Sequence, residues 1–266
     1  MLVAQISDLH VKLPGELAYG KIDSAANIAR CVRHIAGLDP RPEAVIATGD
    51  LVHSGLDAEY VRLRDLLVPL SIPVYPIPGN HDEKKAFAAA FAGQGPAALA
   101  GGALYYAVEA HPVLLIALDS VVPGAEGGAL DDAQLDWLRA TLASGRDRPT
   151  LVFLHHPPIV TGFRRMDEVA LDAGSAARFG DIIEGNPQVE RVVCGHVHRA
   201  IDARWRGTVV SICPSAAYQA RFNLLGGFEP DPQEPPAYQL HYWNGNALVT
   251  HTVSVTGARC PVSGEA

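Results

Sequence analysis

Side chains that bind metals and phosphate follow five short apolar runs of the sequence. They form the blocks Asp8-Leu9-His10, Gly49-Asp50, Gly79-Asn80-His81-Asp82, His155-His156 and Gly195-His196-Val197-His198. If the runs are parallel strands, these blocks meet at one edge, where α/β folds build their sites. Asp, His and Asn without Cys make a hard-to-borderline donor set. The pattern therefore predicts a metal site.

Within that set, Asp50 is alone on its turn and is the candidate to hold two ions. A carboxylate has two oxygens and can bridge ions about 3.5 to 4 Å apart. Each block taken singly has a simpler explanation: a Gly-Asp turn, a left-handed turn at Gly79-Asn80, or an unrelated His-x-His on a strand. The occurrence of all five blocks in one chain favours the site.

The elements that must position these residues are short strands alternating with helices. Strands are expected over residues 2–6, 44–48, 74–77, 104–108, 113–118, 151–154, 191–194 and 208–212. Helices are expected after the N-cap Asp23, from Asp57 to Leu67, after Asp131 with Gln134 at the capping-box position, and over 175–184. This order predicts an α/β fold with helices on the outer faces of sheets. The stretch 226–236 is rich in Pro and Gly, so we expect no regular structure there.

Composition limits the class of protein. The chain has 266 residues, a net charge of −8 and 48% hydrophobic residues, which suits one large domain or two small ones. No run of Lys or Arg is longer than a dipeptide, so nucleic acid and anionic membrane are not expected partners. Cys31, Cys194, Cys213 and Cys260 form no C-x-x-C pair, which favours reduced thiols, with Cys194 in the core, and a cytoplasmic protein.

In these blocks the chain resembles the calcineurin-like metallophosphoesterases. The family signature is D-x-H, G-D, G-N-H-[DE], a His and G-H-x-H, and every part is present. The resemblance runs from residue 1 to at least 212. The flanking residues look like the bacterial branch of class III cyclic-nucleotide phosphodiesterases and glycerophosphodiesterases.

The resemblance implies a four-layer αββα sandwich, with residues 1–266 as one domain and 214–240 as a cap or oligomerisation loop. It also implies two metal ions, with iron, manganese, zinc and cobalt all open, and a homo-oligomer. One ion would be held by Asp8, His10, Asp50 and His198, and the other by Asp50, Asn80, His155 and His196. Between His155 and His156 the sequence is ambiguous, because neighbours on a strand point to opposite faces; His155 matches the family ligand.

The activity implied is hydrolysis of a small phosphodiester, a cyclic nucleotide or a glycerophosphodiester, by metal-bound hydroxide. Catalytic roles fall to Asn80 and to His81, which is placed to donate to a phosphoryl oxygen or to the leaving alkoxide. We expect substrate contacts from His81, Asn80, His198, His53 and Tyr218. The stretch 163–167, with Arg164 and Arg165, either reaches over the metals, where a cation suits a phosphate, or is a solvated loop. Contact by Tyr218 also stays open, because some relatives have His where Tyr218 stands.

Three other functions compete with this reading. A phosphomonoesterase would share the metals, and a non-catalytic scaffold would share the fold. A nuclease is disfavoured by the net charge.

Overall fold

The computed structural model describes residues 1–92 and 104–256, which form two facing sheets. The first has the order β13-β12-β1-β2-β3, made of β1 (Leu2–Ile6), β2 (Ala44–Thr48), β3 (Val74–Ile77), β12 (Ala237–Trp243) and β13 (Leu248–Ser254). The second has the order β4-β5-β6-β7-β9-β8, made of β4 (Tyr106–Val108), β5 (Leu114–Ala117), β6 (Thr150–Phe153), β7 (Val189–Cys194), β8 (Ile201–Trp205) and β9 (Thr208–Ile212). A small hairpin pairs β10 (Gln219–Ala220) with β11 (Pro230–Asp231).

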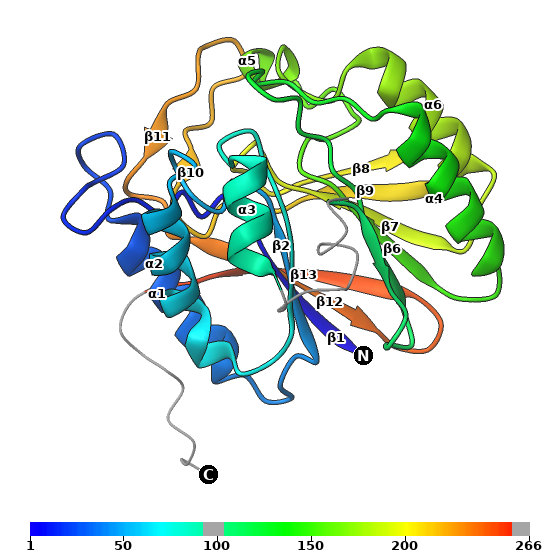
Figure 1. Ribbon diagram of the computed structural model, residues 1–266, viewed down its shortest axis with the longest axis horizontal. Coiled ribbons are helices and arrows are strands. Elements are labelled where there is room, and N and C mark those ends of the chain that lie inside the picture. The colour runs from blue at the N-terminus through cyan, green and yellow to red at the C-terminus, as the bar shows by residue number, and fades with distance from the viewer. Residues whose placement is uncertain (93–103, 257–266) are drawn as a thin grey trace.

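Helices cover the outer side of each sheet, which confirms the four-layer arrangement (Figure 1). The first sheet carries α1 (Ser24–Ala36), α2 (Asp57–Leu67) and α3 (Lys84–Phe91), and the short 3-10 helix η1 (Val68–Leu70) continues directly from α2. The second sheet carries α4 (Asp132–Ser144) and α6 (Ala173–Glu184). A single turn, α5 (Arg164–Asp167), lies at the top of Figure 1 beside the loop between β10 and β11.

The central strands are parallel, and this fixes where their polar ends meet. In the first sheet β1, β2 and β3 run in one direction, and in the second β5, β6, β7 and β9 do so. Both faces of β6 are buried: Leu151 and Phe153 belong to the core between the sheets, whereas Val152 and Leu154 pack under the helices. Burial on both faces explains why this strand is a continuous apolar run in the sequence.

Local signals set the helix starts. Asp23 accepts a hydrogen bond from the main-chain N–H of Ala26, and Asp131 accepts one from Gln134, at 3.0 and 2.8 Å. The expected capping box at Gln134 is wrong, because its side-chain amide bonds both main-chain groups of Asp119 instead. The expectation of no regular structure over 226–236 is wrong at β11, where Pro230 and Asp231 pair with β10.

Several other features bear on the expectations from sequence. Helix α3 and the edge strand β8 were not among the expected elements, although Phe87 and Phe91 lie one turn apart on the buried face of α3 and β8 alternates exposed and half-buried residues as a half-buried strand does. Cys31, Cys194 and Cys213 are buried free thiols, and Cys260 lies outside the described residues. Over residues 1–92 and 104–256, no helix combines the length and hydropathy that crossing a bilayer requires.

His241 is buried between the two sheets, and burial, with the nearby charge of Arg191, lowers its pKa to about 3. Its ring nitrogens bond Gln5 Oε1 and Thr250 Oγ1, both at 2.9 Å. In the unfolded chain the histidine pKa is near 6.5, so between about pH 6.5 and 3 this residue is protonated in the unfolded chain and neutral in the folded chain. The stability that neutral His241 supplies is therefore complete above about pH 6.5 and is lost as the pH falls toward 3.

We expect His241→Gln to reduce the pH dependence of the free energy of unfolding between pH 6 and 4. Because the variant takes up one proton fewer when it unfolds, the slope of the free energy of unfolding against pH falls by about 1.4 kcal/mol per pH unit. Urea unfolding at a series of pH values measures it, with His251→Gln, on the exposed part of β13, as the matched control. An unchanged slope in His241→Gln would contradict this account.

Candidate metal centre

The seven side chains expected to bind metal lie together where the parallel strands end. Asp8 and His10 follow β1, Asp50 follows β2, and Asn80 follows β3. His155 comes two residues after β6, and His196 and His198 follow β7. The ends of five strands that lie far apart in the sequence, β1, β2 and β3 of the first sheet and β6 and β7 of the second, thus contribute to one cluster.

The chain turns sharply as it leaves these strands. Asp8, His10, Asp50, His196 and His198 all have positive φ, between 42° and 73°, in the left-handed region. For residues with a Cβ this conformation costs on the order of 1–3 kcal/mol each and persists only where the surroundings enforce it. At these five positions the fold therefore accepts an unfavourable backbone conformation in order to direct the side chain into the cluster.

Two motif glycines are explained by close approach. A Cβ on Gly79 would lie 2.3 Å from the carboxylate Oδ1 of Asp50, and one on Gly195 would lie 2.0 Å from Ser7 Oγ and 2.8 Å from Asp8 Oδ2. Such separations are far inside van der Waals contact, so any side chain there would displace an acidic residue of the cluster.

The cluster divides into two groups of donor atoms. In the first, the Nε2 atoms of His10 and His198 are 3.1 Å apart, and His198 Nε2 lies 3.5 Å from Asp8 Oδ1. In the second, His155 Nε2 lies 3.2 Å from Asn80 Oδ1 and 3.3 Å from His196 Nδ1. One donor atom each of Asp8, His10 and His198 lies within 4.8 Å of the others, and so do donor atoms of His155 and His196, which is close enough for a common ion in each group.

Asp50 faces both groups. Its Oδ2 lies 3.6 Å from His10 Nε2, and its Oδ1 lies 3.4 Å from His155 Nε2. Burial opposes its ionisation, but the charge and hydrogen bond of His155 hold the Asp50 pKa well below its usual range. Burial likewise opposes charge on His155, yet Asp50 and Asp8 raise its pKa to about 9. The centre of the cluster therefore attracts positive charge.

Main-chain carbonyls fix the histidine tautomers. A carbonyl only accepts, so His155 Nδ1 donates to Thr48 O at 2.8 Å and His198 Nδ1 donates to Tyr218 O at 2.9 Å. In the neutral rings, both Nε2 atoms are left as acceptors facing the cluster. Lone pairs converging from two sides at buried positions fit a cation, so the residues present suit a bound metal.

His156, the alternative at its position, lies beside the cluster, with its ring centroid 4.7 Å from that of His196, but its ring nitrogens are bonded elsewhere. Its Nε2 donates to Glu126 O at 3.0 Å, and its Nδ1 is 2.8 Å from Ser120 Oγ. Burial and the neighbouring charge of His155 lower the His156 pKa to about 3. Both ring nitrogens are thus engaged, and the geometry favours His155 as the donor.

Asp82, the last residue of its block, holds the loops that carry the cluster. Its carboxylate accepts from the main-chain N–H groups of Leu51, Val52 and Gly79, at 3.0, 3.3 and 2.8 Å, and from the Tyr60 hydroxyl at 2.8 Å. Because Leu51 follows Asp50 and Gly79 precedes Asn80, this buried carboxylate ties two of the cluster's loops together.

A cavity of about 160 Å³ opens over the cluster. Among the residues expected from sequence, its walls include His10, Asp50, Asn80, His81, His196, His198 and Tyr218. Asp8 and His155 lie beneath them, fully buried. Arg165 also lines the cavity, whereas the Arg164 side chain is 73% exposed and is not part of the wall.

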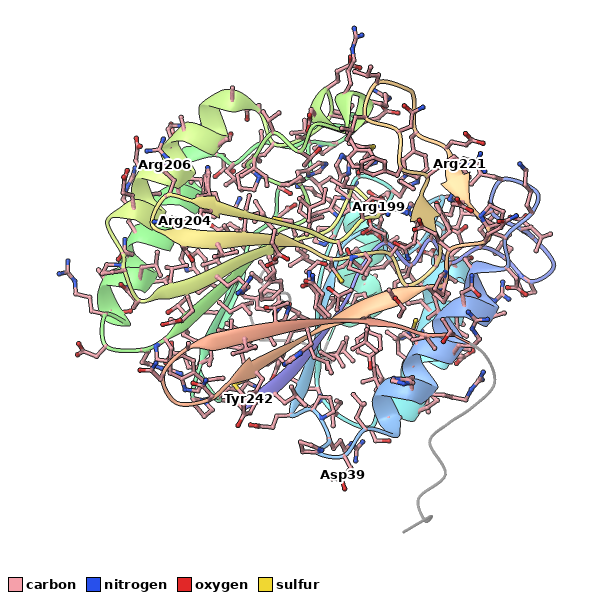
Figure 2. The ribbon with its side chains drawn as sticks, turned by 180° about the vertical axis from the view of Figure 1, so that it is seen from behind. Asp39, Arg199, Arg204, Arg206, Arg221 and Tyr242 are labelled. Carbon is pink, nitrogen blue, oxygen red and sulfur yellow. The ribbon has the colours of Figure 1, made fainter. Side chains whose placement is uncertain are left out.

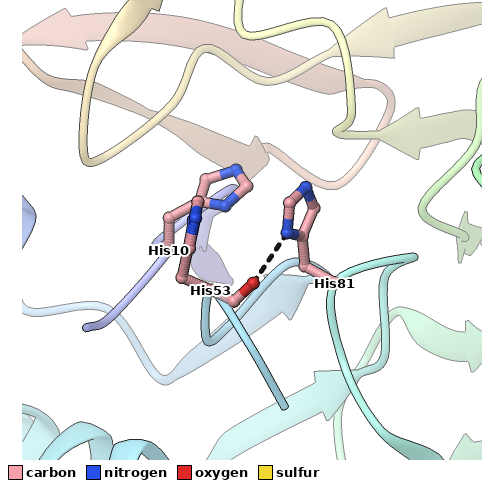
Figure 3. A group of neighbouring side chains, drawn as sticks. All are labelled: His10, His53 and His81. Carbon is pink, nitrogen blue, oxygen red and sulfur yellow. Dashed lines mark hydrogen bonds between the residues drawn. The ribbon is translucent and has the colours of Figure 1, made fainter. Parts of the chain in front are cut away.

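His53 stands beside the cavity rather than in its wall. Its ring centroid lies 5.6 Å from that of His10 and 5.2 Å from that of His81, and its carbonyl accepts from His81 Nδ1 at 2.8 Å (Figure 3). The hydrogen bond from His81 is therefore accepted by the His53 main chain, while the two rings lie side by side. A substrate contact by the His53 ring stays a prediction.

Sequence reasoning missed part of the wall, made by Tyr19, Glu126, Val169 and Phe228. These residues come from loops, and they share no residue type or spacing. Only the position of Arg165 near the strand end at His155 pointed toward this side of the cavity.

Comparison with known proteins identifies the family to which this chain belongs. The pattern of the calcineurin-like phosphoesterases matches residues 1–200, so the chain belongs to that family. It is 35% identical over 254 residues to a probable glycerophosphodiester phosphodiesterase, GpdQ, of Arcobacter nitrofigilis, covering 95% of this chain and 92% of that protein.

A second relative and a solved structure extend the comparison. The chain is 33% identical over 207 residues to the 3',5'-cyclic adenosine monophosphate phosphodiesterase CpdA of Pseudomonas aeruginosa, covering 78% of this chain and 72% of that one. Its fold matches a dimetal phosphatase from Danio rerio with a TM-score of 0.69 at 14% identity, over 96% of this chain and 99% of that one.

We expect Gly195→Ala to lose most of its bound divalent metal and about 1–3 kcal/mol of stability, because the new methyl group displaces Asp8 and Ser7. Metal content by mass spectrometry and urea unfolding measure the two effects. Gly185→Ala, where the nearest atoms are at 3.6 and 3.7 Å, is the matched control. Normal metal content in Gly195→Ala would show that this close approach does not position Asp8.

Proposed function

We propose that this protein is a metal-dependent phosphodiesterase that hydrolyses small phosphodiesters, with cyclic nucleotides and glycerophosphodiesters as the two candidate substrates. The observation that carries the proposal is Asp50, whose two oxygens face two separate groups of donors. Relatives over most of the chain are named for these two diester activities.

We propose two ions in the cluster. The first would be held by Asp8, His10, Asp50 and His198, and the second by Asp50, Asn80, His155 and His196. Iron, manganese, zinc and cobalt all suit these donors. When bound, such ions lower the pKa of water and neutralise charge on phosphoryl oxygens.

His81 and Asn80 act on the substrate from the cavity wall. Because His81 Nδ1 donates to His53 O, Nε2 is the atom that faces the substrate; it can give a proton to a leaving alkoxide when the ring carries a proton on both nitrogens. Asn80 directs its Oδ1 toward His155, so its amide N–H groups remain to bind a phosphoryl oxygen. Tyr218, His198 and His53 are further proposed contacts.

The competing functions are distinguishable by assay. A phosphomonoesterase would use the same donors, and a scaffold would have no reason to keep them together in strained backbone. The cavity of about 160 Å³ favours a small substrate over a macromolecule.

We also propose that residues 1–266 form one domain, with 214–240 as a cap or oligomerisation loop of a homo-oligomer in the cytoplasm. In support, this segment includes the β10–β11 pair and exposes Phe222, Leu224 and Leu225. Buried free thiols suit a reducing compartment.

After reconstitution with manganese, we expect faster hydrolysis of bis(p-nitrophenyl) phosphate than of p-nitrophenyl phosphate. Asn80→Ala should abolish both, because it removes a donor of the cluster and a phosphoryl contact. Preference for the monoester would move the protein to the phosphatases. Inactivity toward both compounds despite bound metal would favour the scaffold.

We expect His81→Ala to lower kcat for the diester by about 10²-fold, the usual contribution of a positioned acid, with unchanged metal content. The same pair of measurements on His251→Ala, on the exposed part of β13, provides the control. Loss of metal in His81→Ala would instead make His81 a ligand.

A further inference from the structure

Strand β13 is an edge of the first sheet and is open on one side. It pairs with β12 residue for residue over Leu248–Ser254, and within residues 1–92 and 104–256 no strand pairs with its other side. Its seven residues include no Pro and no Lys, Arg, Asp or Glu. Prolines, charges and bulges are the features by which proteins ordinarily prevent edge strands from pairing with another chain. Because β13 has none of them, its edge is available for pairing.

The main-chain groups of β13 point alternately toward β12 and toward the open side. Val255 N–H donates to Pro236 O at 2.8 Å just beyond the strand ends, and opposed residues of an antiparallel pair exchange hydrogen bonds only at every second position. The odd-numbered residues of β13 therefore bond β12, and the even-numbered residues direct N–H and C=O outward. The Leu248 carbonyl has this direction, since it accepts from Arg191 Nη2 at 3.4 Å.

The sequence of β13 reads the same in both directions about its centre. Residues 249–253 are Val-Thr-His-Thr-Val, with His251 in the middle. When two copies of this strand pair antiparallel over their full length, His251 lies opposite His251 of the second copy, Val249 opposite Val253, and Thr250 opposite Thr252. In this register the outward-directed, even-numbered residues oppose one another, as the hydrogen bonds between two antiparallel strands require.

The side chains of β13 divide between the two faces of the sheet. Thr250 Oγ1 is 2.9 Å from His241 Nδ1 on the inner face, so His251 and its alternate neighbours point to the outer face. There Val249 is 38% exposed, and Tyr242, its partner on β12, is 45% exposed. Figure 2 labels Tyr242 near the turn that joins the two strands. The valine opposite Val249 in a second copy would add apolar contact at this exposed surface.

We propose that β13 is an interface with a second copy of this chain, in which the two β13 strands pair antiparallel about His251 and join the two first sheets into one continuous sheet. A strand that is palindromic about its centre matches its own copy along its whole length. The contact is therefore isologous, as in dimers with two-fold symmetry. It uses residues other than 214–240, so both contacts can exist in one assembly.

A cysteine at the centre of the strand tests the register. In a Cys260→Ser background, where the thiols of the described residues are buried, His251→Cys is expected to form a disulfide-linked dimer under mild oxidation. Opposed Cα atoms at an unbonded antiparallel position are about 4.5 Å apart, within the range of a disulfide. Val249→Cys is the matched control, because its two copies would lie about 13 Å apart along the strands. Non-reducing electrophoresis measures both variants.

A charge at the same position tests the affinity. His251→Lys places two ammonium groups opposite each other and is expected to raise the dimer dissociation constant by at least about tenfold. The net charge of each chain changes from −8 to −7, so repulsion between whole chains falls and is not the cause. His251→Gln is uncharged and is expected to keep the wild-type constant. Sedimentation velocity over a series of protein concentrations measures all three proteins.

Three outcomes overturn the proposal: a wild-type protein that is monomeric at every concentration, equal cross-linking of Val249→Cys and His251→Cys, or an unchanged dissociation constant in His251→Lys. Leu225→Asp, at a position that is 85% exposed between β10 and β11, separates the two contacts. If the mass falls in Leu225→Asp and not in His251→Lys, the interface lies in that loop and β13 is excluded. An assembly that uses both contacts falls to half its mass in His251→Lys.

Discussion

The sharing of Asp50 between two groups of donors is the constraint on which the site depends. Its two oxygens must face His10, from the first sheet, and His155, from the second, so the sheets have to end at one level. Both sheets meet this with parallel central strands, and cross-sheet bonds hold the edge: His196 N–H donates to Asp8 at 3.0 Å, and His155 donates to Thr48 O at 2.8 Å. The helices outside keep the strands buried.

The same constraint explains where the backbone is strained. A residue that directly follows a strand and points its side chain back over the sheet edge requires the chain to turn sharply at that residue. The positive φ values of Asp8 and Asp50 provide this turn. The glycines next to donors serve the opposite need, since they leave room where two reversals touch, as Gly79 does against Asp50. The motif thus alternates residues that bind with residues that make space.

Much of this was accessible from the sequence, because apolar runs and helix caps are local signals. The strands at 2–6 and 44–48 and the cap at Asp23 have the expected positions. The cavity-wall residues Tyr19, Glu126, Val169 and Phe228 were not accessible, since their meeting depends on packing between distant segments. His156 and His155 could not be separated by pattern, because the difference lies in which carbonyl each ring meets.

Four histidines around the cavity are oriented by main-chain oxygens: His155 by Thr48, His198 by Tyr218, His81 by His53 and His156 by Glu126. Every residue type has a main-chain carbonyl, so the side chains at these four positions are not needed to orient the histidine rings. Two of these residues, Tyr218 and Glu126, line the cavity, so natural variation can replace their side chains and change the surface that a substrate meets while the imidazoles keep their orientation. In such a residue the main-chain carbonyl keeps the histidine in place for the reaction, while the side chain is free to change and alter the range of substrates.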